Sequence, residues 1–190
     1  MSGSVPSYAG NLSTTPEWLH LPLGYHDVRW YAVQTSANHE KRVAEQLSVR
    51  RTEHFLPLYA SLRRWKDRRV VLELPLFPGY VFVRMALSDR MQVLQVAGVA
   101  RLVGFGGMPA ALPEREIETL RAGMARGVRA EPHPFLTAGC RVRVKAGPLV
   151  GMEGIMLRRK SSLRVVISIE LIQRAVAVEV DEGDVEALRR

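Results

Sequence analysis

The chain has 190 residues, of which 47% are hydrophobic, and carries a net charge of +8 with a pI near 10.2. Its single cysteine, Cys140, excludes an internal disulfide and a cysteine-rich metal site, and no apolar run is long enough to span a membrane. These features indicate one or two small globular domains with an acidic partner such as nucleic acid, although a well-solvated basic surface would also explain the charge.

The predicted elements begin after a leader. Residues 1–28 are rich in Ser, Pro, Gly and Thr without periodicity, which predicts a flexible segment. The leader has no Lys or Arg before Arg29, so it does not look like a secretory signal, and we expect a cytoplasmic protein. A β-branched and aromatic run at 29–35 predicts a strand, and Asn38 is a candidate N-cap for a helix over 39–51.

The next hundred residues alternate between strand and turn signals. We expect a strand at 54–59, a basic loop or hairpin tip at 61–70 and two strand segments within 71–85. A short helix follows Ser88 or Asp89, then a strand at 100–105, a turn at 104–109 and a helix from Pro113 to about Arg126.

The stretch PLFPGYVFVRM, residues 75–85, is an apolar run that contains two prolines and a glycine. Proline cannot donate to a sheet ladder, so the pattern predicts a kinked turn at 75–79 that leads into a strand at 80–85. Both faces of that strand start apolar. Either the strand is central in its sheet, or its aromatic face, with Tyr80 and Phe82, binds a partner.

A change of pattern divides the chain into two domains. We predict an N-terminal domain at 29–127, a linker at 128–135 that contains Gly- and Pro-rich sequence, and a C-terminal domain at 136–190. The second domain holds five short β segments separated by turns, which is typical of a small barrel. Residues 29–135 contain 17 basic and 10 acidic residues, a net +7, and residues 136–190 contain 10 and 7, a net +3.

Two groups of basic and polar side chains are candidates for nucleic-acid contact. The first is a stripe on the first predicted helix, His39, Arg42, Gln46 and Arg50, where Arg and Gln could read base edges. The second is a cluster suited to phosphate contact, with an aromatic ring available for base stacking: Arg63, Arg64, Trp65, Lys66, Arg68 and Arg69. A solvated loop tip is the alternative for the second group.

The sequence offers no sign of catalysis or of a cofactor. None of the five histidines has metal-ligand spacing with another His, Cys or acidic residue, and GFGGMP lacks the lysine of a phosphate-binding loop. Cys140 lies beside a β segment, which suggests packing. We therefore predict neither an enzyme nor a metal site.

Three motifs resemble those of NusG-type transcription elongation factors, in the same order: WYAVQT, PLFPGYVFV and RVRVKAGPLVGMEGIM. The resemblance covers residues 29–188. It implies an α+β protein in which an NGN-type antiparallel sheet with flanking helices is joined to a small SH3-like β-barrel with a KOW motif. The stretch GVARLVGFGGMPAALPEREI is similar to the specialised branch that includes RfaH and polysaccharide-operon antiterminators. SIELIQRAV stands where general factors usually carry a Phe-Gly-Arg turn.

The resemblance also implies partners and site residues. The first domain would bind the clamp helices of the RNA polymerase β′ subunit, and also the β subunit, through an apolar surface formed by Phe77, Pro78, Gly79, Tyr80 and Phe82. The helix stripe would touch the non-template DNA strand. The barrel would recruit Rho or a small-subunit ribosomal protein. The pattern alone favours a core position for any one of these aromatic residues, whereas the resemblance favours a surface anchor for Tyr80.

The resulting prediction is a transcription elongation factor that modulates pausing or termination, with a ribosome-associated or RNA-binding KOW protein as the alternative. The second domain is dense in β-branched residues, so we expect a stable five-stranded barrel at 136–190 without a helical alternative. Its aliphatic tip, Ile169, Leu171 and Ile172, would face a partner or belong to the core.

Overall fold

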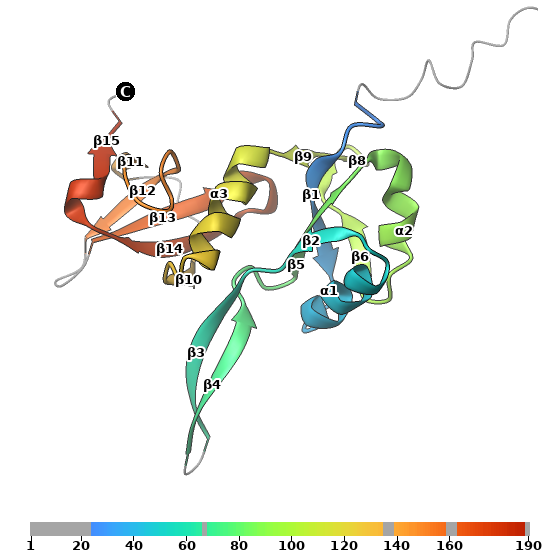
Figure 1. Ribbon diagram of the computed structural model, residues 1–190, viewed down its shortest axis with the longest axis horizontal. Helices are drawn as coiled ribbons and strands as arrows, with labels where there is room; N and C mark the ends of the chain where they lie inside the picture. Colours follow the sequence, from blue (N-terminus) through green and yellow to red (C-terminus); the bar gives the residue numbers. More distant parts are fainter. Residues whose placement is uncertain (1–23, 66–67, 135–138, 159–162, 189–190) are drawn as a thin grey trace, which may run out of the picture.

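A computed structural model describes residues 24–65, 68–134, 139–158 and 163–188 of the chain. The two larger sheets have five and six antiparallel strands, and helix α3 (Glu114–Ala125) lies between them (Figure 1). The predicted α+β class is confirmed. No helix in these ranges is long and apolar enough to cross a membrane.

The first sheet is built around strand β1, which pairs with three other strands. Val33 of β1 lies opposite Val81, and Trp30 lies opposite Arg84. The strand order is β2 (Glu53–Phe55), β5 (Tyr80–Met85), β1 (Arg29–Thr35) and β6 (Val99–Leu102), with β9 (Ala111–Leu112) also paired to β1.

Both faces of this sheet are covered, which explains why both faces of β5 are apolar. One face packs against α1 (Glu40–Val49), whose Val43 and Leu47 are fully buried, and against α2 (Arg90–Leu94). The other face packs against α3 through Ile117 and Leu120. Strand β5 is therefore central, the first of the two alternatives that the sequence left open.

The start of α1 differs from the prediction. The N-cap position belongs to His39, and Asn38 has a left-handed φ of 61° one residue earlier. Asparagine tolerates this conformation better than most residues, so Asn38 serves the turn into the helix rather than the cap.

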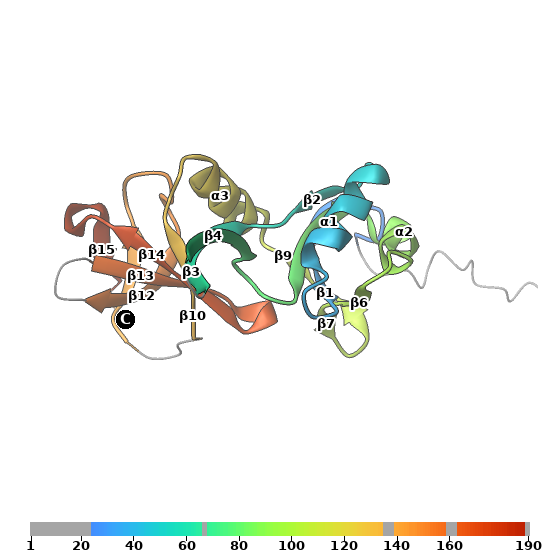
Figure 2. The ribbon, with the colours of Figure 1, turned by 90° about the horizontal axis from the view of Figure 1, so that it is seen from below.

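Two hairpins leave the first sheet. Strands β3 (Leu58–Trp65) and β4 (Arg68–Pro75) form a sheet of their own that extends away from the rest of the protein (Figure 1) and is seen nearly end-on in Figure 2. Residues 61–70, predicted as a basic loop or hairpin tip, therefore belong to the outer part of a hairpin, and most of them are strand. The shorter hairpin pairs β7 (Gly104–Phe105) with β8 (Met108–Pro109). A 3-10 helix, η2 (Leu87–Asp89), precedes α2.

The second sheet forms the C-terminal domain, which we call the barrel domain (residues 130–188). Its inward side chains include Val142, Val165, Ile167, Val176 and Val178. The strand order is β10 (Ala130–His133), β14 (Arg174–Val180), β13 (Leu163–Ile169), β12 (Glu153–Arg158), β11 (Arg141–Val144) and β15 (Val185–Ala187). The 3-10 helices η3 (Glu170–Ile172) and η4 (Glu182–Asp184) lie between these strands.

The predicted linker at residues 128–135 differs in part from the structure. Residues 130–133 form strand β10, which pairs with β14 from Ala130 opposite Val178 to His133 opposite Ala175. Pro132 fits there because β10 is an edge strand, where a missing N–H costs no ladder bond on the open side. The connection between α3 and the barrel domain is therefore only residues 126–129.

Candidate functional site

The turn at Phe77–Tyr80 is fixed by hydrogen bonds on both sides of Gly79. The Gly79 N–H donates to Glu40 Oε1 over 2.7 Å, and the Thr35 N–H donates to the Gly79 carbonyl over 2.9 Å. Gly79 has a φ of +85°, which favours glycine although open space surrounds its Cα. The turn is thereby tied to the end of β1 and the start of α1.

Two of the predicted aromatic anchors lie in the core. Phe77 is 1% exposed and Phe82 is fully buried, and their rings meet edge to face with centroids 5.5 Å apart. Phe55 stacks on the other side of Phe82 at 6.2 Å. In this conformation neither Phe77 nor Phe82 presents a surface to a partner, because both side chains are buried in the hydrophobic core.

Tyr80 and Pro78 are the members of the turn that reach the surface. Pro78 is exposed, whereas Tyr80 is half-buried. The guanidinium carbon of Arg174, at the start of β14, lies 5.8 Å from the centroid of the Tyr80 ring. The barrel domain therefore contacts the predicted partner surface of the first domain through a cation–π interaction.

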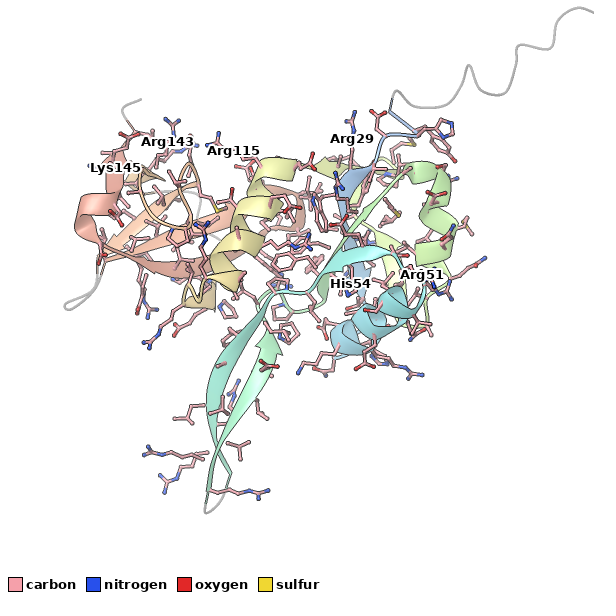
Figure 3. All side chains as sticks on the ribbon, viewed as in Figure 1. Arg29, Arg51, His54, Arg115, Arg143 and Lys145 are labelled. Carbon is pink, nitrogen blue, oxygen red and sulfur yellow. The ribbon has the colours of Figure 1, made fainter. Side chains whose placement is uncertain are left out.

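Helix α3 continues this contact between the two domains. Gly123 is buried against Leu149, so closely that a Cβ built at Gly123 would overlap Leu149 Cδ2. Arg115, at the other end of α3, extends toward the barrel domain on the side of Arg143 and lies over Gly151 (Figure 3). Both domains consequently contribute to one hydrophobic cluster.

The predicted aliphatic tip of the barrel domain belongs to the same cluster. Ile169 and Ile172 are 3% and 4% exposed, and Leu171 is half-buried against the cluster. The sequence left two alternatives for these residues, a place in the core or a surface that faces a partner. In this structure Ile169 and Ile172 belong to the core.

The stripe on α1 is partly engaged within the protein. Gln46 Nε2 donates to the Ala97 carbonyl over 3.4 Å, and Arg50 Nη1 donates to the Gln92 carbonyl over 2.8 Å. His39 is half-buried, with Nδ1 2.9 Å from the Ala37 carbonyl. Arg42 is exposed and has no hydrogen bond to any described residue. Two of the four stripe residues therefore also hold α1 against α2 and the segment that follows it.

The second basic group lies at the far end of the β3–β4 hairpin. Arg63, Arg64, Arg68 and Arg69 are all exposed. Lys66 and the side chain of Trp65 lie outside the described residues, so the predicted base stacking is not tested. Cys140, expected to pack beside a strand, is exposed.

An ionic network that the sequence did not reveal joins α3 to the first sheet. Arg84 pairs with Glu53 and Glu114, and Arg121 pairs with Glu53 over 2.9 Å. Hydrogen bonds from Arg121 and Arg84 lower the pKa of Glu53. The indole N–H of Trp30 donates to Glu118, and the Arg121 guanidinium lies over the Trp30 ring. These partners are up to 88 positions apart, so no local pattern identifies them.

Among the described residues, no group of three or more His, Cys, Asp or Glu side chains could hold a metal ion. The features of the site are thus a preformed turn, a covered tyrosine and two basic surfaces. They suit macromolecular binding.

Comparisons with known proteins place these features in context. Residues 28–121 match the family model described as "Transcription termination factor nusG". The chain is 32% identical over 183 residues to the transcription termination/antitermination protein NusG of Vibrio parahaemolyticus, with 84% of this chain and 96% of the relative covered. It is 30% identical over 181 residues to NusG of Escherichia coli K12, with 83% and 95% covered.

A solved structure described as "Domain interaction in Thermotoga maritima NusG" has the same fold. It superposes with a TM-score of 0.56 at 23% identity and covers 87% of this chain and 100% of that one.

Proposed function

Because the chain belongs to the NusG family of transcription termination/antitermination proteins, we propose that it binds RNA polymerase through the turn at residues 77–80. The observation that carries the proposal is the geometry of Gly79, which two hydrogen bonds hold in a conformation that presents Pro78 and Tyr80 at the start of the central strand β5. A preformed apolar turn can receive an amphipathic helix at a low entropic cost, as the clamp helices of the β′ subunit would require.

The mechanism is non-enzymatic and acts on a conformational equilibrium. The first domain bridges the β′ clamp and the β subunit and binds the closed polymerase more tightly than the open one. A ligand shifts an equilibrium only by its differential affinity for the two states, so this preference suppresses pausing. Arg42 and the other polar side chains of the α1 stripe face the non-template strand, and the basic hairpin contacts phosphates.

The barrel domain regulates access to this surface. In the docked arrangement Arg174 covers Tyr80, while Ile169 and Ile172 are buried in the shared cluster. Polymerase binding through Tyr80 therefore competes with docking. Undocking would expose the aliphatic tip to Rho or to a small-subunit ribosomal protein.

We assign the protein to the specialised, operon-restricted branch of the family. Support comes from the sequence of residues 98–117 and from Glu170–Arg174, where Gln173 takes a left-handed φ of 53° and no Phe-Gly-Arg turn occurs. Mapping the protein on the genome tests this assignment. Occupancy confined to a few transcription units is expected, and enrichment over all transcribed genes would assign it to the general factors.

The polymerase site is tested by Tyr80→Ala in a nuclease-treated pull-down of core RNA polymerase. Loss of an aromatic anchor typically weakens binding by 2 kcal/mol or more, about thirtyfold in Kd. The variant also loses the Arg174 contact, which favours undocking by only about 0.5–1 kcal/mol, so the net effect is weaker binding.

Phe105→Ala is the matched control, because Phe105 is 72% exposed on the β7–β8 hairpin and lies outside the proposed surface. Unchanged polymerase affinity of a folded Tyr80→Ala protein would refute the site. Equal losses in both variants would show that the assay reports general surface hydrophobicity.

A further inference from the structure

Strand β4 has one edge of backbone groups that no described part of the protein covers. It pairs with β3 along its whole length and with no other strand, and no backbone hydrogen bond joins residues 68–74 to a described residue outside β3. In an antiparallel ladder every second residue points its N–H and C=O away from its partner strand. The edge of β4 is therefore a row of free donors and acceptors, and Figure 1 shows the hairpin clear of both domains.

One face of the hairpin gains little from the pairing of β3 with β4 alone. Leu62 and Val71 lie opposite each other on that face and are 60% and 63% exposed. Arg64 lies opposite Arg69 on the same face, and opposed like charges destabilise a ladder. A further strand would improve both pairs if it placed an apolar side chain beside Val71 and a carboxylate beside Arg69.

A second copy of β4 is such a strand. Val71 lies midway between Arg69 and Glu73, and the three side chains share one face because side chains alternate along a strand. Two antiparallel copies of β4, related by a two-fold axis through Val71, would place each Arg69 opposite the Glu73 of the other copy. The two Val71 side chains would lie opposite each other, and Val70 would lie opposite Leu72. The edge of β4 is thus self-complementary in charge and in apolar character.

Only this register pairs the charges. A two-fold axis normal to the sheet has to pass through a residue, because opposed side chains lie on the same face. An axis through Val70 would oppose Arg69 to Val71, and an axis through Leu72 would oppose Arg69 to Pro75. The free edge of β3 contains no acidic residue, so two copies of β3 could form no such ion pair.

We propose that two copies of this chain dimerise by antiparallel pairing of residues 69–73 of β4, which joins their hairpins into one four-stranded sheet. Two ion pairs between Arg69 and Glu73 flank a row of four aliphatic side chains, Leu62 and Val71 of each copy. A two-stranded ribbon is marginally stable in water, and additional strands with an apolar face stabilise it. The interface is small, so the dimer is weak and depends on protein concentration.

Sedimentation velocity of the full-length, nuclease-treated protein tests the proposal between about 1 and 100 μM. We expect a shift from monomer to dimer as the concentration rises. Arg69→Glu and Glu73→Arg each replace two ion pairs with two like-charge pairs, so each should raise the Kd of the dimer about tenfold or more. An equimolar mixture of the two variants should dimerise again, because one copy supplies two carboxylates and the other supplies two guanidinium groups.

Lys41→Glu and Glu45→Arg are the matched controls. Both positions are exposed on α1, and the two substitutions change the net charge of the chain by the same amounts as the two hairpin variants. Each control should keep the parental Kd.

Oxidative cross-linking tests the register of the two strands. In a Cys140→Ser background, which removes the exposed native thiol, Val71→Cys places two thiols opposite each other across the two-fold axis. Leu62→Cys is the control, because the exposed fraction of Leu62 is similar but its two copies would lie three strand spacings, about 14 Å, apart. A disulfide requires the two Cα atoms to lie within about 7 Å, so only Val71→Cys should form a covalent dimer on a non-reducing gel.

A parental protein that stays monomeric over the whole concentration range would overturn the proposal. A dimer that persists in both charge-reversal variants, or that is lost equally in the α1 controls, would overturn it as well. Failure of the mixed variants to dimerise, or equal cross-linking of the two cysteine variants, would exclude this register. Retained polymerase pull-down by a monomeric Glu73→Arg protein would show that dimerisation is independent of the proposed function.

Discussion

At the scale of single residues, the buried carboxylate of Glu40 is the group that shapes the proposed binding surface. Glu40 is 5% exposed, occupies the first turn of α1 and accepts the Gly79 N–H. An acidic side chain is favourable at a helix N-terminus, so one residue stabilises both the helix and the turn. The hydrogen bond connects segments 39 positions apart.

Glu40→Ala should destabilise the protein by about 1–3 kcal/mol, because it leaves the Gly79 N–H without its acceptor. Glu40→Gln keeps an acceptor oxygen at the same position and should recover most of this loss. Denaturant unfolding of both variants, with a parallel polymerase pull-down, measures the effect. If the alanine and glutamine variants are equally unstable, the charge of Glu40 matters more than its hydrogen bond.

At the scale of elements, α3 belongs to both domains. Ile117 and Leu120 face the cluster shared with the first sheet, and Gly123 faces Leu149 of the barrel domain. The helix ends in a tight motif in which the Val128 N–H donates to the Gly123 carbonyl and the Gly127 N–H donates to Met124. Because this end is fixed and the connection to β10 is short, the orientation of the barrel domain depends on packing against α3.

Gly123→Leu should separate the domains while α3 stays folded. Leucine is a better helix former than glycine, by somewhat less than about 1 kcal/mol, but its side chain cannot fit beside Leu149. We expect NMR relaxation to show two independently tumbling domains. Ala122→Leu, on an exposed position of the same helix, is the control. A Gly123→Leu protein that tumbles as one body would contradict this account of the interface.

At the scale of the whole molecule, the docked arrangement couples the two proposed binding surfaces. The apparent affinity for polymerase is the intrinsic affinity multiplied by the undocked fraction of the protein. The Arg174–Tyr80 contact is one of the interactions that set this fraction.

Arg174→Ala should therefore raise the apparent affinity for polymerase. A cation–π contact of about 0.5–1 kcal/mol corresponds to a two- to fivefold change when the docked form dominates. Titration of the protein into core polymerase measures the effect, and Arg174→Lys should lie between the variant and the parent. Lys145→Ala, an exposed position on the barrel domain, is the control. Unchanged or weaker binding by Arg174→Ala would show that docking does not limit access.

Sequence alone was enough for the features that depend on local pattern. The kinked turn before β5 follows from Pro75, Pro78 and Gly79, since proline and glycine restrict or permit backbone angles whatever surrounds them. The β-strands of the second domain follow from its β-branched residues. The burial of Val43 and Leu47 follows from their helical spacing. Each of these signals spans only a few residues.

Only the tertiary structure decided which surfaces are open. Phe77, Tyr80 and Phe82 look alike in the sequence, yet two are buried and one is half-covered by Arg174 of another domain. Residues 130–133 of the predicted linker form strand β10 because they pair with the edge of β14. Burial and strand pairing depend on partners far along the chain, and a local pattern does not specify which distant segment will cover it.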